Sequence, residues 1–145
     1  MRTVFPRLRR AAILACAPLA FTLACHDSST NPSTTDISGV YSLQTIGGTG
    51  LPVTFQTSTT TTTTLTSDVL TVGSDGTWSE AETVQQTVNG QTTPGSVSDG
   101  GTWSLNGTTV TFVSTANGVV DYVGTYNSGT LTLDSGDGQA QVFQR

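Results

Sequence analysis

From residue 37 to residue 145, short runs rich in Thr, Val, Leu and aromatic residues alternate with turn sequences that contain Gly, Asn or Asp. No stretch of this part shows the 3.6-residue hydrophobic period of an amphipathic helix. Short apolar runs separated at regular intervals by turn residues are typical of all-β proteins. The pattern therefore predicts an all-β domain with strands at 39–46, 51–56, 65–73, 77–88, 96–105, 108–114, 119–126, 130–134 and 139–144.

Turn sequences separate these strands. Asn106-Gly107 is the strongest hairpin signal, because both positions of such a turn must accept a positive φ. Ser74-Asp75-Gly76, Asn117-Gly118, Asn127-Ser128-Gly129 and Asp137-Gly138 mark further corners. Because short connections pair strands that are neighbours in sequence, the pattern predicts an antiparallel meander.

A Gly-Thr pair recurs before an apolar or aromatic residue, as in Gly76-Thr77-Trp78, Gly101-Thr102-Trp103 and Gly124-Thr125-Tyr126. We interpret each Gly as closing a turn and each Thr as starting a strand whose next residue faces the core. The predicted core residues are Trp78, Trp103, Phe112, Tyr122, Tyr126, Leu131, Leu133 and Phe143.

The first 25 residues have the order of a secretory signal: a basic segment, an apolar run from Ala11 to Phe21, and small residues before Cys25. The apolar run is shorter than the roughly 20 residues that a membrane-spanning helix needs. Leu23-Ala24-Cys25 resembles the lipobox of bacterial lipoproteins, which implies a signal peptide over 1–24 and a lipidated Cys25. Residues 25–36 would then be the lipidated cysteine and a polar, flexible tether.

Two other cleavage sites remain open. A lipobox ending at Cys16 would leave only Ala11 to Ala15 as the apolar run, which is shorter than signal peptides require. Ordinary signal cleavage would leave Cys25 as a free thiol. A single exported cysteine has no internal disulfide partner, so modification of Cys25 is the interpretation we favour.

Removal of residues 1–24 leaves Arg145 as the one base against ten acidic residues, a formal charge of −9. Nucleic acids and anionic lipid surfaces are recognised through Lys and Arg, so both classes of partner are excluded. His26 is the only histidine, and residues 37–145 contain no His, Cys or Lys. Ser–His and Cys–His catalysis, Schiff-base chemistry and zinc sites built on His or Cys are therefore excluded from the folded part.

Trp78, Glu80, Glu82, Val84, Gln86 and Val88 lie on one face of the predicted strand 77–88, because side chains alternate along a strand. We favour an overhanging strand with both glutamates in solvent. The alternative is an inward face on which Glu80 and Glu82 contact a ligand or act as an acid/base pair like that of a glycosidase.

Two other segments carry alternatives. The Thr-rich stretch 57–66 is expected to be a mobile loop or an edge ribbon, with a glycosylated or adhesive loop as the alternative. Asp134 and Asp137, with the Gly136 and Gly138 carbonyls, are spaced for a weak calcium loop at best, so we assign no metal site and no cofactor.

Four elements, in this order, resemble the bacterial lipocalin-like domain. The first is Gly39-Val40-Tyr41-Ser42-Leu43, and the second is Leu70-Thr71-Val72 followed by Asp75-Gly76-Thr77-Trp78. The third is Gly101-Thr102-Trp103-Ser104-Leu105 followed by Thr109-Val110-Thr111-Phe112, and the fourth is Gly124-Thr125-Tyr126 followed by Leu131-Thr132-Leu133. The family has Trp where Tyr41 stands. The resemblance covers residues 37–145 and implies an up-and-down barrel of about eight strands. It also implies that Arg145 packs over Tyr41 and closes the barrel. A β-sandwich is the alternative fold.

The function that the resemblance implies is non-enzymatic. A lipid-anchored, monomeric envelope protein, expected at the outer membrane, would bind a small apolar or amphipathic molecule in the barrel mouth. The candidate ligand-binding residues are Trp78, Glu80, Glu82, Trp103 and Tyr122. The alternatives are a surface or periplasmic protein-interaction module with a solid barrel and, last, a carboxylate-based hydrolase. The protein partner of such a module is not indicated by the sequence.

Overall fold

The computed structural model describes residues 35–145, without the side chain of Gln56. The predicted signal peptide 1–24, Cys25 and most of the tether lie outside the described residues. None of the described segments is a helix that is long and apolar enough to cross a membrane. The strands are β1 (Gly39–Ile46), β2 (Thr49–Gly50), β3 (Val53–Gln56), β4 (Thr61–Val72), β5 (Thr77–Val88), β6 (Gln91–Asn106), β7 (Thr109–Ser114), β8 (Val120–Asn127), β9 (Thr130–Asp134) and β10 (Ala140–Gln144).

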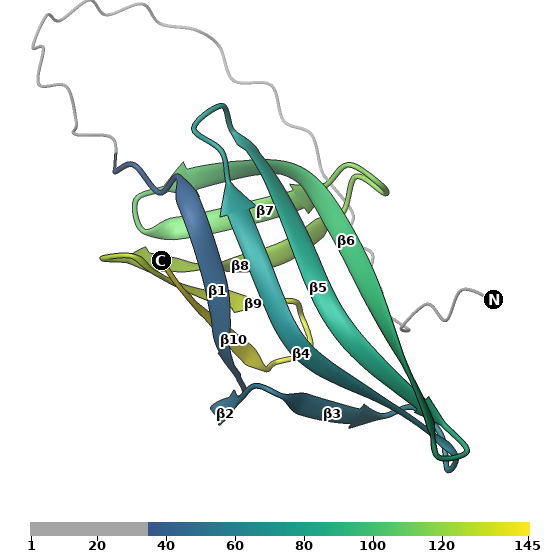
Figure 1. The fold of residues 1–145 in the computed structure, drawn as a ribbon. Helices are drawn as coiled ribbons and strands as arrows, with labels where there is room; N and C mark the ends of the chain where they lie inside the picture. The colour runs from purple at the N-terminus through teal and green to yellow at the C-terminus, as the bar shows by residue number, and fades with distance from the viewer. Residues whose placement is uncertain (1–34) are drawn as a thin grey trace, which may run out of the picture. The chain divides into compact units, whose positions relative to one another are not determined.

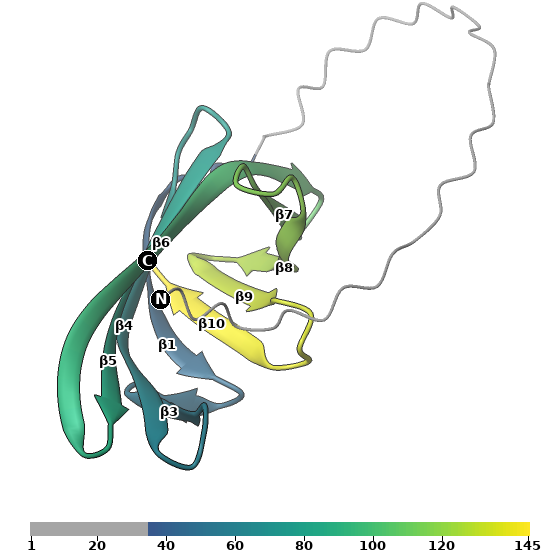
Figure 2. The same cartoon turned by 90° about the vertical axis from the view of Figure 1, so that its right-hand side faces the viewer.

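Eight of these strands close into an antiparallel barrel (Figures 1 and 2). The order runs β1, β10, β9, β8, β7, β6, β5, β4, and β4 pairs back with β1. From β3 to β10 each strand pairs with the next strand in sequence, and β1 closes the circle between β10 and β4. The prediction of an all-β up-and-down barrel is therefore confirmed, and the β-sandwich alternative is wrong.

The strands β4, β5 and β6 run past the closed part of the barrel, as both views show. Closure uses Gly39–Ser42 of β1 and Val69–Val72 of β4. Beyond this contact the two strands part: β1 pairs with the short β2, and β4 pairs with β3. We call the projecting four-stranded part the distal sheet. It consists of Val53–Gln56, Thr61–Leu65, Val84–Val88 and Gln91–Gly95.

The Thr-rich stretch does not form the expected mobile loop or edge ribbon over its second half. Residues 61–66 belong to β4, which begins four residues before the predicted strand 65–73. Thr61–Leu65 pairs with β5 on one side, and Thr62–Leu65 pairs with β3 on the other. Threonine is β-branched and suits a strand, and the two neighbouring strands fix the register that a one-residue repeat leaves open.

Strand β6 begins at Gln91, five residues before the predicted start. The preceding Asn89 and Gly90 have φ values of 49° and 82°, as a two-residue hairpin turn between Val88 and Gln91 requires. The sequence carried this Asn-Gly signal, and the prediction overlooked it. Pro94 is accepted inside β6 because no second strand pairs with this part of β6 in the described chain.

Three glycine positions differ from the sequence interpretation. Asn106 was predicted to be a turn residue, but it pairs with Thr109 and belongs to the strand. The two-residue hairpin loop is therefore Gly107 and Thr108, and Gly107 has a positive φ of 62°. Gly101 and Gly124 lie inside strands and close no turn. A Cβ at either position would run into the backbone of the adjacent strand, so glycine permits the close approach of strands there.

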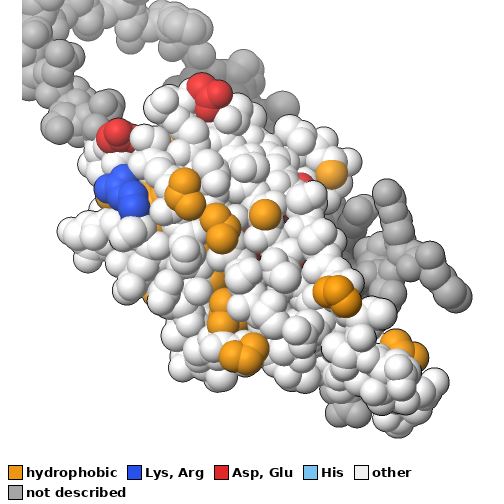
Figure 3. All heavy atoms as spheres, in the orientation of Figure 1, with side chains coloured by type: hydrophobic (Ala, Val, Ile, Leu, Met, Phe, Trp, Pro, Cys, Tyr) orange, Lys and Arg blue, Asp and Glu red, His pale blue; other side chains and the backbone are white. Residues whose placement is uncertain are grey.

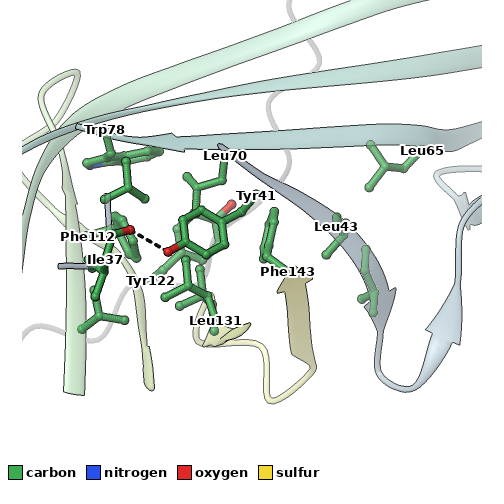
Figure 4. Packing of buried hydrophobic residues seen from close by; sticks show 14 residues of the cluster. Ile37, Tyr41, Leu43, Leu65, Leu70, Trp78, Phe112, Tyr122, Leu131 and Phe143 are labelled. Atoms are coloured by element: carbon green, nitrogen blue, oxygen red, sulfur yellow. Dashed lines mark hydrogen bonds between the residues drawn. The ribbon is translucent and has the colours of Figure 1, made fainter. Parts of the chain in front are cut away.

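The barrel interior is filled by side chains. The core residues that the sequence predicted are buried or, for Trp103 and Tyr126, partly buried against the core. Figure 4 shows Tyr41 in the middle of this packing, with its hydroxyl group donating to the Ile37 carbonyl at 2.6 Å. Side chains are expected to fill an eight-stranded barrel, because its bore is about as wide as they are long. The buried apolar residues are Ile37, Tyr41, Leu43, Ile46, Leu65, Leu70, Val72, Trp78, Val110, Phe112, Tyr122, Leu131, Leu133 and Phe143.

Arg145 lies over the start of the first strand. Its guanidinium carbon is 5.7 Å from the centre of the Tyr41 ring, and its Nη1 donates to the Ser38 carbonyl at 2.6 Å. A Cβ at Gly39 would come within 2.7 Å of the Arg145 side chain, so the glycine makes room for the arginine. Because Ser38 and Arg145 are at opposite ends of the folded chain, this contact joins the first and last strands.

An Arg145→Ala variant is expected to lower the melting temperature by about 2–8 °C, since an exposed cation–π contact is worth about 0.5–1 kcal/mol and 1 kcal/mol shifts the melting temperature of a domain of this size by about 4–8 °C. Differential scanning calorimetry of the two proteins measures the difference. Arg145→Lys keeps the charge but loses the planar group, and should recover part of the loss. An unchanged melting temperature in Arg145→Ala would show that the contact does not stabilise the barrel.

Candidate functional site

The structure brings together four of the five residues that the sequence proposed for ligand binding, with Glu82 next to Glu80. Trp78 and Glu80 from β5 face Tyr122 from β8 in the barrel interior. The Trp78 ring meets the rings of Phe112 and Tyr122 edge-on, at centroid distances of 5.6 and 6.2 Å. Figure 4 shows these three aromatic side chains packed together. They form part of the core.

Trp103 lies at the border of this group, directly opposite Phe112 across β6 and β7, and packs against the core. Its indole N–H donates to the Gly73 carbonyl at 2.8 Å, and its side chain is partly exposed. It borders a hollow of about 310 Å³ with Asp36 and Ser74. The structure therefore does not place Trp78 and Trp103 around one ligand.

Glu80 corrects the interpretation that both glutamates are solvated. Glu80 is only 6% exposed, and the Tyr122 hydroxyl lies 2.9 and 3.0 Å from its two carboxylate oxygens. Glu82 is half-buried, two residues farther toward the distal sheet. The solvated interpretation failed for Glu80 because Glu80 lies opposite Leu70, within the Val69–Val72 stretch of β4 that closes the barrel, and the overhang of β5 starts only at Glu82.

Asp68 completes a group that sequence reasoning missed. Asp68 lies on β4 directly opposite Glu82, and it is 3% exposed. Carboxylate oxygens of Asp68, Glu80 and Glu82 all lie within 4.8 Å of one another. The available signal was the alternation of Asp68, Leu70 and Val72, which puts the aspartate on the same inward face as two core residues. We call these three residues the carboxyl cluster.

Asp99 borders the carboxyl cluster on the other side and has its own hydrogen-bond donors. It pairs with Glu80 across β5 and β6. Its Oδ1 accepts hydrogen bonds from the Gly100 N–H at 2.7 Å and the buried Ser114 hydroxyl at 3.0 Å. Four of the ten acidic residues of the chain are thus grouped in neighbouring strands.

Burial and mutual repulsion raise the pKa values of two members of the carboxyl cluster. Burial, with the charge of Glu82, raises the pKa of Asp68 to about 7. Burial, with the charge of Asp68, raises the pKa of Glu80 to about 8, although the Tyr122 hydrogen bond acts in the opposite direction. Burial and the charge of Glu80 also raise the pKa of Tyr122, which keeps its hydroxyl as a donor. At neutral pH the cluster therefore favours a bound proton or cation.

Comparisons of the chain with models of protein families, with curated proteins and with solved structures find no match. Besides the hollow beside Trp103, one of about 230 Å³ lies at Val120, Asp121 and Asp134. Neither hollow includes Trp78, Glu80 or Tyr122.

The acidic turn at Asp134 and Asp137 is explained by its own hydrogen bonds. Asp134 Oδ1 accepts from the Gly136 N–H at 2.7 Å and from the Gly138 N–H at 3.3 Å. Asp137 accepts from the Gln139 N–H at 2.9 Å. Aspartates that bond to the backbone two residues on are common in turns.

Proposed function

We propose that the protein is a lipid-anchored, non-enzymatic envelope module that binds another protein along the free edge of β6. The observation that supports this most is the long stretch of β6 with a strand on one side only. β6 pairs with β5 from Gln91 to Thr102, whereas β7 pairs with β6 from Gly101 onward. Residues 91–98 are all exposed. An exposed strand edge is a template for an added strand.

The backbone groups at this edge can be assigned by counting along the ladder. Antiparallel pairs alternate between hydrogen-bonded and non-hydrogen-bonded, and the Val88–Gln91 pair closes the turn with hydrogen bonds. The even-numbered residues from Thr92 to Ser98 therefore direct their N–H and C=O groups away from β5. The same parity holds farther along, where the Gly100 carbonyl accepts from the Thr115 N–H on the opposite side from β5.

The chemistry of this edge indicates an uncharged, extended partner segment. Residues 91–98 are Gln-Thr-Thr-Pro-Gly-Ser-Val-Ser, without a charged side chain. Figure 3 shows scattered hydrophobic side chains among uncharged polar atoms on the face of β4 and β5. Recognition would rest on main-chain hydrogen bonds between strands, with Pro94 limiting the length of the pairing because it lacks a donor.

The packed interior gives no support to the alternative of a small apolar ligand in the barrel. The aromatic residues proposed to line a ligand site pack against one another, and the two hollows lie elsewhere. Native mass spectrometry of the gently purified protein tests this point. A small molecule that is carried with the protein and lost on denaturation would favour the ligand-binding barrel over the interaction module.

Ser96→Pro is expected to abolish partner binding at the edge, with at least a tenfold loss of cross-linking. The substitution removes an N–H that points away from β5, so the β5–β6 ladder keeps its hydrogen bonds. Ser96→Ala keeps the N–H and serves as the matched control. Far-UV circular dichroism and melting temperature establish that both variants are folded.

The binding itself is measured by cysteine-directed cross-linking in cells that make the protein natively. Residues 35–145 contain no cysteine, so a cysteine introduced there is unique in the barrel. Ser98→Cys places a cross-linker at the edge. Thr132→Cys places it at an exposed position of β9, which has a strand on each side. Adducts from position 98 but not 132, lost in Ser96→Pro, are expected. Equal adducts at both positions would refute an edge-binding function.

A further inference from the structure

The carboxyl cluster carries more negative charge than the described chain compensates. Asp68 and Glu80 are almost fully buried, and Glu82 is half-buried beside them. Arg145 is the only base in residues 35–145, and it is engaged with Ser38, Tyr126 and the Tyr41 ring. Buried carboxylates are normally paired with a cation or bound to a metal, because removing the charge from water is costly.

An oxygen atom of Asp68 supplies a second, independent observation. Asp68 interacts with Glu80 through its side chain, yet its Oδ1 is buried and has no hydrogen-bond partner. Its carboxylate is directed at the other two members of the cluster. Buried polar atoms nearly always have a partner, and an unsatisfied one points to a bound water or ion. Tyr122 cannot fill this role, because its hydroxyl donates to Glu80.

The donor set selects the kind of ion. All the ligand atoms are hard carboxylate oxygens, which suit Ca²⁺ and Mg²⁺ rather than the metals that prefer nitrogen or sulfur. Two ligands on opposite sides of Ca²⁺ are up to about 4.6–5.2 Å apart, whereas two ligands of Mg²⁺ are at most about 4.2 Å apart. One carboxylate oxygen from each of the three residues lies within 4.8 Å of the other two, a spread that Ca²⁺ accommodates more readily than Mg²⁺. The half-buried Glu82 gives an ion and its remaining waters a path to solvent.

We propose that Asp68, Glu80 and Glu82 form a Ca²⁺-binding site in the barrel wall, at the base of the distal sheet. The ion would join β4 to β5 where the two strands leave the closed barrel. The raised pKa values of Asp68 and Glu80 agree with this assignment, since they report carboxyl groups that need a positive partner. The site does not depend on the proposed edge binding of β6.

Titration of Ca²⁺ into the chelator-treated mature protein at pH 8 tests the proposal. Millimolar Ca²⁺ is expected to raise the melting temperature by about 5–10 °C, and the same concentration of Mg²⁺ by less than half as much. Tb³⁺ serves as a second probe, because Tyr122 and Trp78 next to the cluster can transfer excitation to a bound lanthanide ion. Its luminescence should appear on binding and fall when Ca²⁺ is added.

Glu82→Gln and Asp68→Asn should each abolish the Ca²⁺ shift and the Tb³⁺ signal. Both remove a repulsive charge, so the variants should fold at least as well as the original protein without Ca²⁺. The control is Asp134→Asn with Asp137→Asn, which alters the other acidic turn and should leave both responses intact. No response in the original protein, or a response that survives Glu82→Gln, would overturn the proposal and leave the cluster as a proton-binding group.

Discussion

The Ca²⁺-free protein should lose stability as the pH rises from about 5 to about 8. The pKa values of Asp68 and Glu80 are 3.8 and 4.5 in an unstructured chain and about 7 and about 8 in the folded protein. Over this interval the folded state binds more protons than the unfolded state, so raising the pH favours unfolding. We expect the free energy of unfolding to fall by about 2–5 kcal/mol, with the change levelling off above pH 8.

Urea denaturation in the presence of a chelator, repeated at unit steps of pH, measures this loss. Glu80→Gln should flatten the profile, because it removes the carboxyl group with the higher pKa of the two. Asp75→Asn is the control. Asp75 is exposed, and hydrogen bonds from Thr77 lower its pKa, so its removal leaves the slope above pH 5 unchanged. A stability that is level or rising from pH 5 to 8 would contradict the expectation.

Trp78→Ala should destabilise the barrel by about 3–5 kcal/mol, which is a large part of the 5–15 kcal/mol typical of a domain. Trp78 is 4% exposed, and its ring meets those of Phe112 and Tyr122 edge-on. Its indole N–H also donates to the Val113 carbonyl at 3.2 Å. The substitution leaves a cavity between β5, β7 and β8 and removes the hydrogen bond from the indole to Val113.

Trp103→Ala is the matched comparison, because Trp103 also donates an indole hydrogen bond but is partly exposed. We expect a loss of about 1–2 kcal/mol there. Chemical denaturation followed by circular dichroism measures both variants under the same conditions. If Trp103→Ala cost as much as Trp78→Ala, the core would extend to Trp103, and the packing around Trp78 would not be the main anchor of β5.

The carboxyl cluster shows why part of the site was out of reach of sequence reasoning. The strand at 77–88 could be predicted, and with it the shared face of Glu80 and Glu82. Asp68 is remote from them in sequence and meets Glu82 only through the β4–β5 register. That register contains a bulge at Thr66, and a shift of one residue would turn Asp68 outward. Local patterns do not fix such a shift.

Local chemistry by itself determined the class of fold, most strand positions and the core. Alternating Val, Leu, Thr and aromatic residues between Gly and Asn turns suffice to predict an antiparallel meander. Each short turn makes the two strands that flank it pair, and the alternation determines which face of each strand is buried. The tertiary structure alone decided three features: where β1 leaves β4, that β6 keeps a free edge from Gln91 to Ser98, and that Asp68 joins Glu80 and Glu82. The first depends on a contact between strands that are not neighbours in sequence, and the other two depend on the register and the unequal lengths of neighbouring strands, which short segments do not fix.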